Sequence, residues 1–436
     1  MKLEIGNFHV KSIRFGSQTA FKDGVLTVNK EEAIAAVNPD KKLKNIDLHI
    51  VRPGDNVRML PVKDVVEPRV RPDGRPVFPG YSGPFSPCGD GVVHALKDMS
   101  VIVVGKYGGW MDGLLDMSGP AAEMTMYSKL INLVIVAEEV DMFRTLDEKL
   151  KSNTYFRLTA HLLAEYVGAV VKDQQPEDWE RYELGKVGGS LPKVALVMHL
   201  MTFKKQREGL CTLFYGFDAS SILPTLTHPN EVLDGALVSD VLSIAGSRFA
   251  TYDFQNFPLI KSLYREHGKT IELAGVILGT QETTAEGKDR DANRVANIAG
   301  LLGCDGAIVV KKGCGNVDID LFNSIIRLEE IGIKTVGAAP VSTGRDGSNQ
   351  PFVTVDPRAD AITCGGCEGE IIELPPMETV LGDLHSIGRD GYPGAWTSDP
   401  VYGPSLREDG SLIIDVVSIF ESDGCAGWSN KTTMEF

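Results

Sequence analysis

TIELAGVILGT, residues 270–280, is an apolar run of strand length that opens a regular alternation of segments. A helix-like segment follows at 291–303 (DANRVANIAGLLG), and a second apolar run follows at 305–313 (DGAIVVKKG). The pattern repeats with a helix-like segment at 316–332 and a strand-like segment at 334–341. Strands that alternate with helices of this length predict a parallel sheet with right-handed crossovers. We therefore expect an α/β fold with a Rossmann-like arrangement in this part of the chain.

The segments around this core suggest a division of the chain. Residues 1–71 contain short alternating runs that predict a small β-rich N-terminal domain. Residues 72–99 are rich in proline and glycine and predict a connection without regular structure. Strand-like and helix-like runs in 100–242 predict a first α/β domain, and 243–436 is expected to form a second one.

Composition limits the function classes. The chain of 436 residues carries a net charge of −15, which argues against a general nucleic-acid or anionic-membrane surface. No apolar run approaches the roughly 20 residues that a membrane helix needs, and the N-terminal MKLEIGNFHVK does not resemble a secretory signal. We expect a cytoplasmic protein whose seven cysteines are reduced, and small substrates or protein partners.

A glycine-rich stretch, KKGCGNVD at 311–318, follows one of the predicted strands. In parallel α/β sheets ligands collect beyond the carboxyl ends of the strands. Gly313 and Gly315, followed by Asn316, can turn backbone amides toward an anion ahead of the next helix. The stretch is not a dinucleotide fingerprint, because the G-x-G-x-x-G spacing fails at Asp318. It is interpreted either as a plain loop or as a contact for a substrate carboxylate or a partner.

Two cysteines at C-x-x-C spacing, Cys364 and Cys367, lie in the sequence TCGGC. This spacing lets two thiols form a disulfide or share a metal ion. Together with Cys304 and Cys314 they would complete a four-thiolate zinc site. Three interpretations stay open: a redox pair, a metal site of unknown metal, or inert loop cysteines. Cys88 is a further single thiol and a weaker candidate.

Several longer segments, in this order, resemble component B proproteins of glycine, sarcosine and betaine reductases, whose relatives include the D-proline reductase proprotein. The match spans nearly the whole chain. The segments are FPGYSGPFSPCGDGVVHALKDMSVIVVG (78–105), GLLDMSGPAAEMTMYSKLINLVIVAE (113–138), LTHPNEVLDGALVSD (226–240), YREHGK (264–269), GCGNVDIDL (313–321) and AGWSNKTTMEF (426–436).

This resemblance implies reductive cleavage of a carbon–nitrogen bond in a small amine or amino acid. In the family, the proprotein is cut at an internal cysteine, whose remnant becomes a pyruvoyl group. The pyruvoyl ketone condenses with the amine to an iminium, and a selenolate of a partner subunit attacks the substrate carbon. The resemblance therefore also implies a hetero-oligomer. Its partners would be a second component B subunit, which carries selenocysteine or cysteine, and a small thiol or selenol carrier protein.

The position of the processing cysteine departs from the family pattern. After the matching VSD the chain has Val241 and Leu242, and Ser243 comes next. A serine can in principle attack the preceding carbonyl and end as a pyruvoyl group, so Ser243 is the candidate cofactor-forming residue if the chain is cut. That reaction needs a base and an oxyanion donor, for which the nearby candidates are Thr227, His228, Asn230 and Asp240.

The alternative is an intact chain, which is the outcome that we expect, because leucine stands where the family has its cysteine. Asp240 and His228 would then bind the substrate amine directly. His228 has two interpretations, a general acid or base tuned by Glu231 or the cap of a turn. Two functions remain open. One is a catalytic subunit of a C–N-cleaving reductase, and the other is a non-catalytic subunit that binds an amino compound or holds a catalytic partner.

Overall fold

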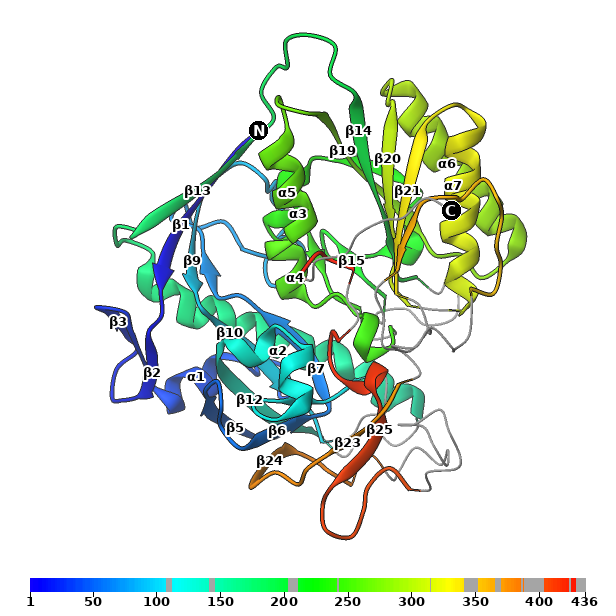
Figure 1. Ribbon diagram of the computed structural model, residues 1–436. Coiled ribbons are helices and arrows are strands. Elements are labelled where there is room, and N and C mark those ends of the chain that lie inside the picture. The colour runs from blue at the N-terminus through cyan, green and yellow to red at the C-terminus, as the bar shows by residue number, and fades with distance from the viewer. Residues whose placement is uncertain are drawn as a thin grey trace.

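The structure is a computed structural model of residues 1–436, and it describes most of the chain. The described residues form a mixed α/β fold with several mixed sheets, which confirms the expected α/β class (Figure 1). Only the backbone is described for 146–152 and 364. The described ranges are 1–106, 112–140, 146–202, 211–240, 243–313, 315–340, 352–364, 370–385, 387, 404–422 and 425–428.

A six-stranded sheet contains the alternation that the sequence predicts. Its strand order is β17-β19-β14-β20-β21-β22, and only β17 runs antiparallel to its neighbour. The parallel strands reverse their order at β14, because β19 lies on one side of it and β20 on the other. The strands are β14 (Lys193–Leu200), β17 (Thr225–Thr227), β19 (Glu272–Thr280), β20 (Gly306–Val310), β21 (Lys334–Ala339) and β22 (Ile362–Cys364).

Helices cover both faces of this sheet, as Figure 1 shows. Side chains of a strand alternate between its faces, so Ala195 and Val197 of β14 pack in the cluster with α6 and α7. Leu196 and Met198 pack on the other face, in the cluster with α4 and α5. The helices on this sheet are α3 (Pro229–Leu233), α4 (Thr251–Asn256), α5 (Pro258–Glu266), α6 (Ala285–Leu301) and α7 (Asp318–Glu330).

The N-terminal strands share sheets with later parts of the chain. Strand β1 (Lys2–His9) runs parallel to β9 (Gly91–Lys97) and antiparallel to β13 (Asp178–Glu183). Strand β8 (Arg69–Val70) pairs with the other edge of β9. Residues 1–71 are therefore rich in strands, as expected, but most of these strands pair with strands from later parts of the chain. An exception is the local sheet of β2 (Ser12–Phe15), β3 (Ala20–Lys22) and β4 (Val25–Val28), which precedes helix α1 (Lys30–Ala36).

A second large sheet has the order β5-β12-β10-β7. Helix α2 (Leu146–Gly168) packs on it, and Phe156 and Leu163 of the helix share a core cluster with Val101 and Val103 of β10. The range 72–99 contains β9 and the first residue of β10, so it is not wholly irregular. The strands are β5 (Leu43–Val51), β7 (Val62–Val66), β10 (Met99–Val104) and β12 (Ile131–Glu139).

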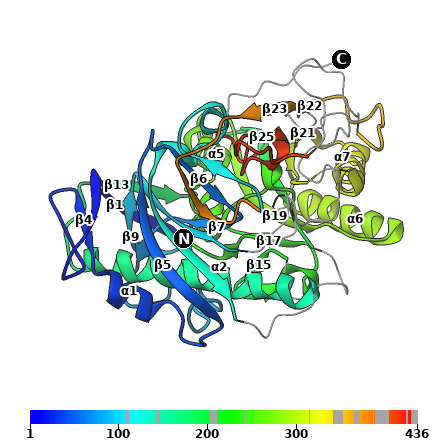
Figure 2. The same ribbon diagram turned by 90° about the horizontal axis from the view of Figure 1, so that it is seen from below.

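The C-terminal part returns to the N-terminal sheets, and its orange and red ribbon can be followed in Figure 2. Strand β24 (Thr379–Gly382) runs parallel to β6 (Val57–Leu60), which also pairs with β11 (Leu115–Asp116). Strands β23 (Ile371–Leu374) and β25 (Leu412–Asp415) form a two-stranded sheet. A further small sheet holds β15 (Leu213–Phe214), β16 (Phe217–Asp218) and β18 (Leu237–Val238). None of the described helices has the length and apolar character needed to span a membrane.

Candidate functional site at the carboxyl ends of β14 and β20

The carboxyl ends of β14, β19 and β20 meet where the strand order reverses. Ligands of open α/β sheets bind beyond the carboxyl ends of the strands at such a point. Hydrogen bonds tie the backbone together here: the Thr202 hydroxyl donates to the Gln281 carbonyl, and Gln281 Nε2 donates to the Lys312 carbonyl at 2.8 Å. Lys312 follows β20 and its side chain is fully buried. The strand ends therefore place a buried cation at this point.

Lys312 forms an ion pair with Asp240, and neither side chain is exposed to solvent. The other carboxylate oxygen of Asp240 accepts two hydrogen bonds from Ser243, from the N–H at 2.7 Å and from the hydroxyl at 2.8 Å. Arg248 is also buried and donates from Nη2 to the Ser243 carbonyl at 3.1 Å. The structure thus brings two sequence-predicted residues, Asp240 and Ser243, into one network with two cations.

Asp240 is held in its ionised form. Burial by itself raises the pKa of this carboxyl, but the charges of Lys312 and then Arg248 outweigh burial and lower the pKa to about 2. A carboxylate with so low a pKa is a weak base. It is also a poor general base at neutral pH, because a general base works best when its pKa is near the operating pH. Asp240 is therefore suited to orienting a cation or a donor, and poorly suited to removing a proton from a hydroxyl.

A serine-derived pyruvoyl group does not fit this arrangement. Formation of the internal ester requires the Ser243 hydroxyl to lose its proton, and the group that accepts its hydrogen bond is the weak base Asp240. The N–H of Ser243 is bound to the same carboxylate oxygen, so the residue is fixed from two sides. Val241 and Leu242 lie outside the described residues. We assign no reaction step to a pyruvoyl group in this chain.

A second buried carboxyl group, Asp253 of α4, lies among aromatic side chains. Its Oδ1 accepts hydrogen bonds from the Tyr127 hydroxyl and the Trp428 indole N–H, both at 2.8 Å. The Tyr252 ring centroid lies 5.7 Å from that of Tyr127 and 6.2 Å from that of Trp428. Tyr127 is fully buried and Trp428 is 39% exposed, so this group of residues reaches the surface at Trp428. Aromatic rings next to a carboxyl group are a typical environment for a cationic amine.

Asp253 differs from Asp240 in its protonation. Burial raises the pKa of Asp253 to about 6, although hydrogen bonds with Glu421, Trp428 and Tyr127 act in the opposite direction. The Asp253 charge also acts on Lys312, whose pKa it raises against the lowering effect of burial. The two groups of residues are therefore electrostatically connected. Together they hold one permanent carboxylate and one carboxyl group that titrates near neutral pH, a combination typical of functional sites.

Three other predicted residues form the start of helix α3. His228 Nδ1 accepts a hydrogen bond from the Asn230 N–H at 3.1 Å, and Glu231 Oε2 accepts one from the His228 N–H at 2.7 Å. These reciprocal bonds are a capping box. The Thr227 hydroxyl donates to the same Glu231 oxygen at 2.6 Å. Of the two interpretations of His228, the local hydrogen bonds match the cap.

This capping box lies away from Asp240 and Ser243. Thr227 pairs with Val276 in the middle of β19, and the antiparallel β17 leads the chain from there toward the amino end of β19, whereas Lys312 follows the carboxyl end of β20 in the same sheet. Asn230 is buried, and its amide donates to the carbonyls of Gly89 and Tyr182, outside the charged network. The five residues that the sequence grouped as catalytic are therefore divided between two separate hydrogen-bonded groups.

The glycine-rich turn after β20 adopts the backbone that only glycine favours, with φ of 75° at both Gly313 and Gly315. The Gly313 N–H donates to Ser247 Oγ at 3.1 Å, so this amide already has a partner within the protein. Asn316 is exposed. In the first turn of α7, Asp318 forms an ion pair with Lys311 at 2.5 Å. The contact of Gly313, Gly315 and Asn316 with a substrate carboxylate stays a prediction.

The C-x-x-C pair is only partly described. Cys364 ends β22, and its side chain and Cys367 lie outside the described residues. Cys304 lies before the amino end of β20, whereas Cys364 lies at the carboxyl end of β22 in the same parallel sheet. At least the length of a strand therefore separates the two residues. Zinc–sulfur bonds of about 2.3 Å do not span this separation. The prediction of a four-thiolate site that includes Cys304 is therefore wrong. Within the described ranges no cluster of three metal-ligating side chains occurs.

Cys88 is not an activated thiol. Its side chain is buried and donates to the Tyr215 hydroxyl at 3.3 Å. Burial, followed by the charge of Asp234, raises the pKa of the Cys88 thiol far above its usual value. A thiol rather than a thiolate is present at neutral pH, and only the thiolate is a good nucleophile.

Sequence reasoning missed Lys312, Arg248 and Asp253. Lys311 and Lys312 directly follow the apolar run AIVV, and two charges at the carboxyl end of a buried strand are a signal that was available. Arg248 precedes the aromatic-rich segment FATYDFQNF (249–257) and Asp253 lies within it, and nothing in their local spacing distinguishes them from surface residues. Only the packing of α4 against the sheets reveals that both are buried.

Comparison with known proteins gives consistent relatives. The chain is 47% identical to the betaine reductase complex component B subunit alpha of Peptoclostridium acidaminophilum, over the whole of both chains. It is 36% identical to the glycine reductase complex component B subunits alpha and beta of Acetoanaerobium sticklandii, again over the whole of both chains. It is 35% identical, over the whole of both chains, to the sarcosine reductase complex component B subunit alpha of Peptoclostridium acidaminophilum. No solved structure matches the chain.

The names of these relatives differ in one respect. The glycine reductase relative is described as subunits alpha and beta, whereas the betaine and sarcosine relatives are each described as a subunit alpha. A family model for glycine/sarcosine/betaine reductase component B subunits matches residues 1–434. With these identities and this match over nearly its whole length, the chain belongs to the family of glycine/sarcosine/betaine reductase component B subunits.

Proposed function

We propose that this chain acts unprocessed, as a single subunit of a reductase complex that cleaves a carbon–nitrogen bond. Its substrate would be a small amino compound whose nitrogen is already a fully substituted cation. The observation that carries the proposal is the Ser243 hydroxyl, which donates to an Asp240 carboxylate held ionised by Lys312 and Arg248. Among the described residues, the Ser243 hydroxyl contacts no base suited to activate it, and leucine stands at the family's processing position, so we propose that the chain forms no ketone.

The chemistry of the leaving group connects an intact chain with the substrate. A primary or secondary amine leaves poorly, and condensation with a ketone improves it by forming an iminium. A quaternary ammonium group has no N–H bond with which to condense, and it leaves as a neutral tertiary amine that takes the C–N electron pair. Such a substrate needs no ketone. The relative that is 47% identical is described as a betaine reductase subunit, which supports this class of substrate.

The aromatic side chains around Asp253 support binding of the cationic nitrogen. Quaternary ammonium groups bind to the faces of aromatic rings, and Tyr127, Tyr252 and Trp428 lie together with the Asp253 carboxyl group. Trp428 is partly exposed and gives this group of side chains contact with solvent. A substrate carboxylate would then be bound by Lys312 or by the turn at Gly315 and Asn316.

The nucleophile would come from another protein. The sequence contains no selenocysteine, and the buried Cys88 is not ionised. We propose that a second component B subunit with selenocysteine or cysteine supplies the attacking group, and that a small thiol or selenol carrier protein receives the product. Membership in a component B family supports a complex of this kind.

An intact-mass measurement on the denatured protein tests the absence of processing. We expect one species of the full chain mass and no label after treatment with a carbonyl reagent or borohydride. The matched variant Ser243→Ala should give the same result, because Ser243 has no processing role. Two fragments that meet between Leu242 and Ser243, with the label on the C-terminal one and no cleavage in Ser243→Ala, would contradict the proposal.

Calorimetric titration with glycine, sarcosine and betaine tests the substrate class. We expect heat of binding for betaine, and weaker or no binding for the two amines that keep an N–H bond. Trp428→Ala should weaken betaine binding by about tenfold, since one cation–π contact is worth about 1 to 2 kcal/mol when desolvated. An intact chain that binds none of the three compounds would instead favour a non-catalytic subunit that holds a catalytic partner.

A further inference from the structure

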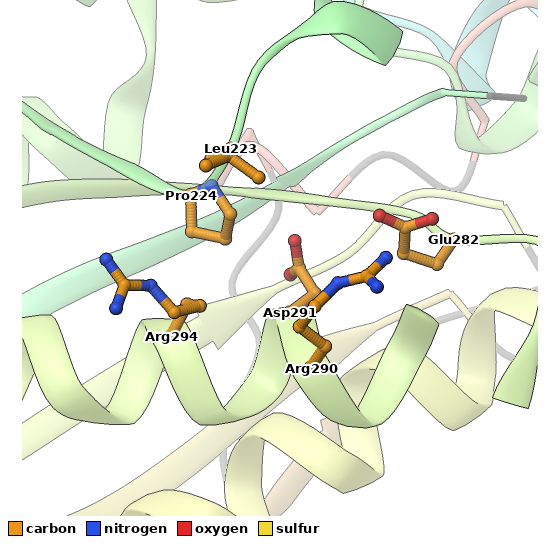
Figure 3. Close-up of a pocket in the computed structure, with 6 residues that line it drawn as sticks. All are labelled: Leu223, Pro224, Glu282, Arg290, Asp291 and Arg294. Atoms are coloured by element: carbon orange, nitrogen blue, oxygen red, sulfur yellow. The ribbon is translucent and has the colours of Figure 1, made fainter. Parts of the chain in front are cut away.

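A surface pocket lies between the segment before β17 and helix α6 (Figure 3). Its volume is about 110 Å³. Figure 3 shows Arg290 and Arg294 extending from α6 in opposite directions, with the guanidinium group of Arg290 on the side of Glu282. The pocket is lined by Leu223, Pro224, Glu282, Arg290, Asp291 and Arg294.

The two arginines of this pocket are exceptional in the molecule. Arg290 and Arg294 lie one turn apart on α6 and are exposed. Among the arginines in the described part of the chain, they alone have neither a hydrogen bond nor an ion pair, whereas each of the others has at least one. A guanidinium group offers five donors in a fork that matches a carboxylate. Each of these two groups is available to bind an anionic group.

The acidic side chains of the pocket form no ion pair with these arginines among the described residues. Both Asp291 and Glu282 are buried. The Asp291 carboxylate accepts hydrogen bonds from Thr280, from its hydroxyl at 2.6 Å and from its N–H at 3.2 Å. The Glu282 carboxylate lies against Gly287 in the first turn of α6, where the helix dipole offsets a negative charge. The two acidic residues of the pocket are therefore buried, while the two arginines are exposed.

An apolar rim adjoins the arginines. Leu223 is 65% exposed and Leu226, in β17, is 44% exposed. Strand β17 packs against α6 and ends the six-stranded sheet, so its outer backbone edge has no further strand among the described residues. An exposed sheet edge can accept an extended segment of another chain, with hydrogen bonds to the backbone and pockets for alternate side chains. A small anion would use the arginines but not the leucines or the strand edge.

We propose that this surface, defined by Leu223, Leu226, Arg290 and Arg294, docks an extended, acidic and partly apolar segment of a partner protein. Carboxylates of the segment would bind the two arginines, and its apolar side chains would cover the two leucines. The chain as a whole carries a net charge of −15, so an acidic segment is repelled by most of the surface and would bind where exposed arginines have no ion pair. Charge arranged in this way gives specificity and register more than affinity. The proposal does not depend on the substrate or on the processing of the chain.

Fluorescence anisotropy with a labelled peptide of alternating glutamate and leucine tests the proposal on the full chain. Alternation places all carboxylates on one face of an extended segment and all leucines on the other. We expect saturable binding that weakens with added salt, and no binding of a peptide that alternates lysine and leucine. The double variant R290E/R294E should bind the acidic peptide at least about tenfold more weakly, a change of about 1.4 kcal/mol.

Two further variants separate the proposal from general charge effects and from a small-anion site. K269E/K334E changes the net charge by the same amount at exposed lysines outside the pocket, and it should bind the peptide like the unchanged chain. Leu223→Asp should also weaken binding at least about tenfold, because an apolar contact is lost and a repulsive charge is added. Neither arginine has a partner to lose, so unchanged far-UV circular dichroism is expected.

Three results would overturn the proposal. Equal weakening in R290E/R294E and K269E/K334E would mean a general charge effect. Competition by inorganic phosphate or free glutamate at the concentration of the peptide, with no effect of Leu223→Asp, would mean a small-anion site. Absence of any binding of the acidic peptide to the unchanged chain would mean that the surface does not dock such a segment.

Discussion

Replacement of Lys312 by methionine would remove the charge that keeps Asp240 ionised inside the protein. Methionine retains most of the aliphatic length of lysine, so the main change is electrostatic. Breaking a buried pair by removing one partner costs about 3–5 kcal/mol, because the other charge is left uncompensated. Asp240 would keep its two hydrogen bonds from Ser243 and the influence of Arg248. We therefore expect a loss near the lower end, about 3 kcal/mol, in the free energy of unfolding.

Urea unfolding followed by tryptophan fluorescence measures this loss as a shift of the transition. A double-mutant cycle of Lys312→Met and Asp240→Asn isolates the pair, and we expect the double variant to lose much less than the sum of the single ones. The matched control is the pair of Lys193 and Glu272, which are 3.5 Å apart and about one-third exposed. The cycle of Lys193→Met and Glu272→Gln should give a coupling of about 0–1 kcal/mol.

The pH dependence supplies an independent check with a defined sign. In the unchanged chain the Asp240 pKa is lowered to about 2, so its contribution to stability is present above the unfolded value and is lost as the pH falls. In Lys312→Met the same carboxyl is buried without its main partner, its pKa rises, and protonation relieves the penalty. The stability difference between the two proteins should therefore shrink as the pH falls from 7 toward 4. A loss no larger than in Lys193→Met, or a difference that does not change with pH, would refute the reasoning.

Two further predictions concern the other residues of the site. His228→Ala should lower the free energy of unfolding by about 1 kcal/mol through loss of the helix cap, and reductase activity of the assembled complex should be unchanged; a large loss of activity at equal stability would return His228 to the active site. Asp253→Asn should flatten the pH dependence of stability between about pH 4 and 6. In the unchanged chain the raised pKa of Asp253 makes the folded state bind a proton more tightly than the unfolded state, so the unchanged chain loses stability as the pH rises through this window. Chemical unfolding at a series of pH values measures that slope, and an identical slope in both proteins would contradict the assignment.

The sequence predicted best where interactions are local. The run from β19 through α6, β20 and α7 to β21 appears at the expected positions. Strands and helices each show a hydrophobic period that can be read from consecutive residues. The insertion of β14 between β19 and β20 was not predicted, since strand order depends on contacts far apart in the chain. The pairing of β1 with β9 and of β6 with β24 was missed for the same reason, and the N-terminal strands therefore looked like a separate domain.

The same limit applies to the site. Asp240 and Ser243 were singled out because they are close in sequence to the family's processing position, and they do form one hydrogen-bonded unit. Lys312 is 72 residues from Asp240, and Trp428 is 175 residues from Asp253, so neither contact has a local signal. His228 was grouped with Asp240 on proximity in the chain, and the turn of the backbone through α3 and β18 separates them.

The position of β14 has a consequence for any version of this chain that is cut after residue 242. Strand β14 would belong to the first fragment, yet it lies between β19 and β20 of the second, with parallel pairing along both of its edges. Strand β24 of the second fragment would likewise remain paired with β6 of the first. The two fragments would behave as interlocked halves of one body, so a nick would not release them, and they should also assemble when produced as separate polypeptides. Strand pairing alone should therefore hold the architecture together, without backbone continuity after residue 242.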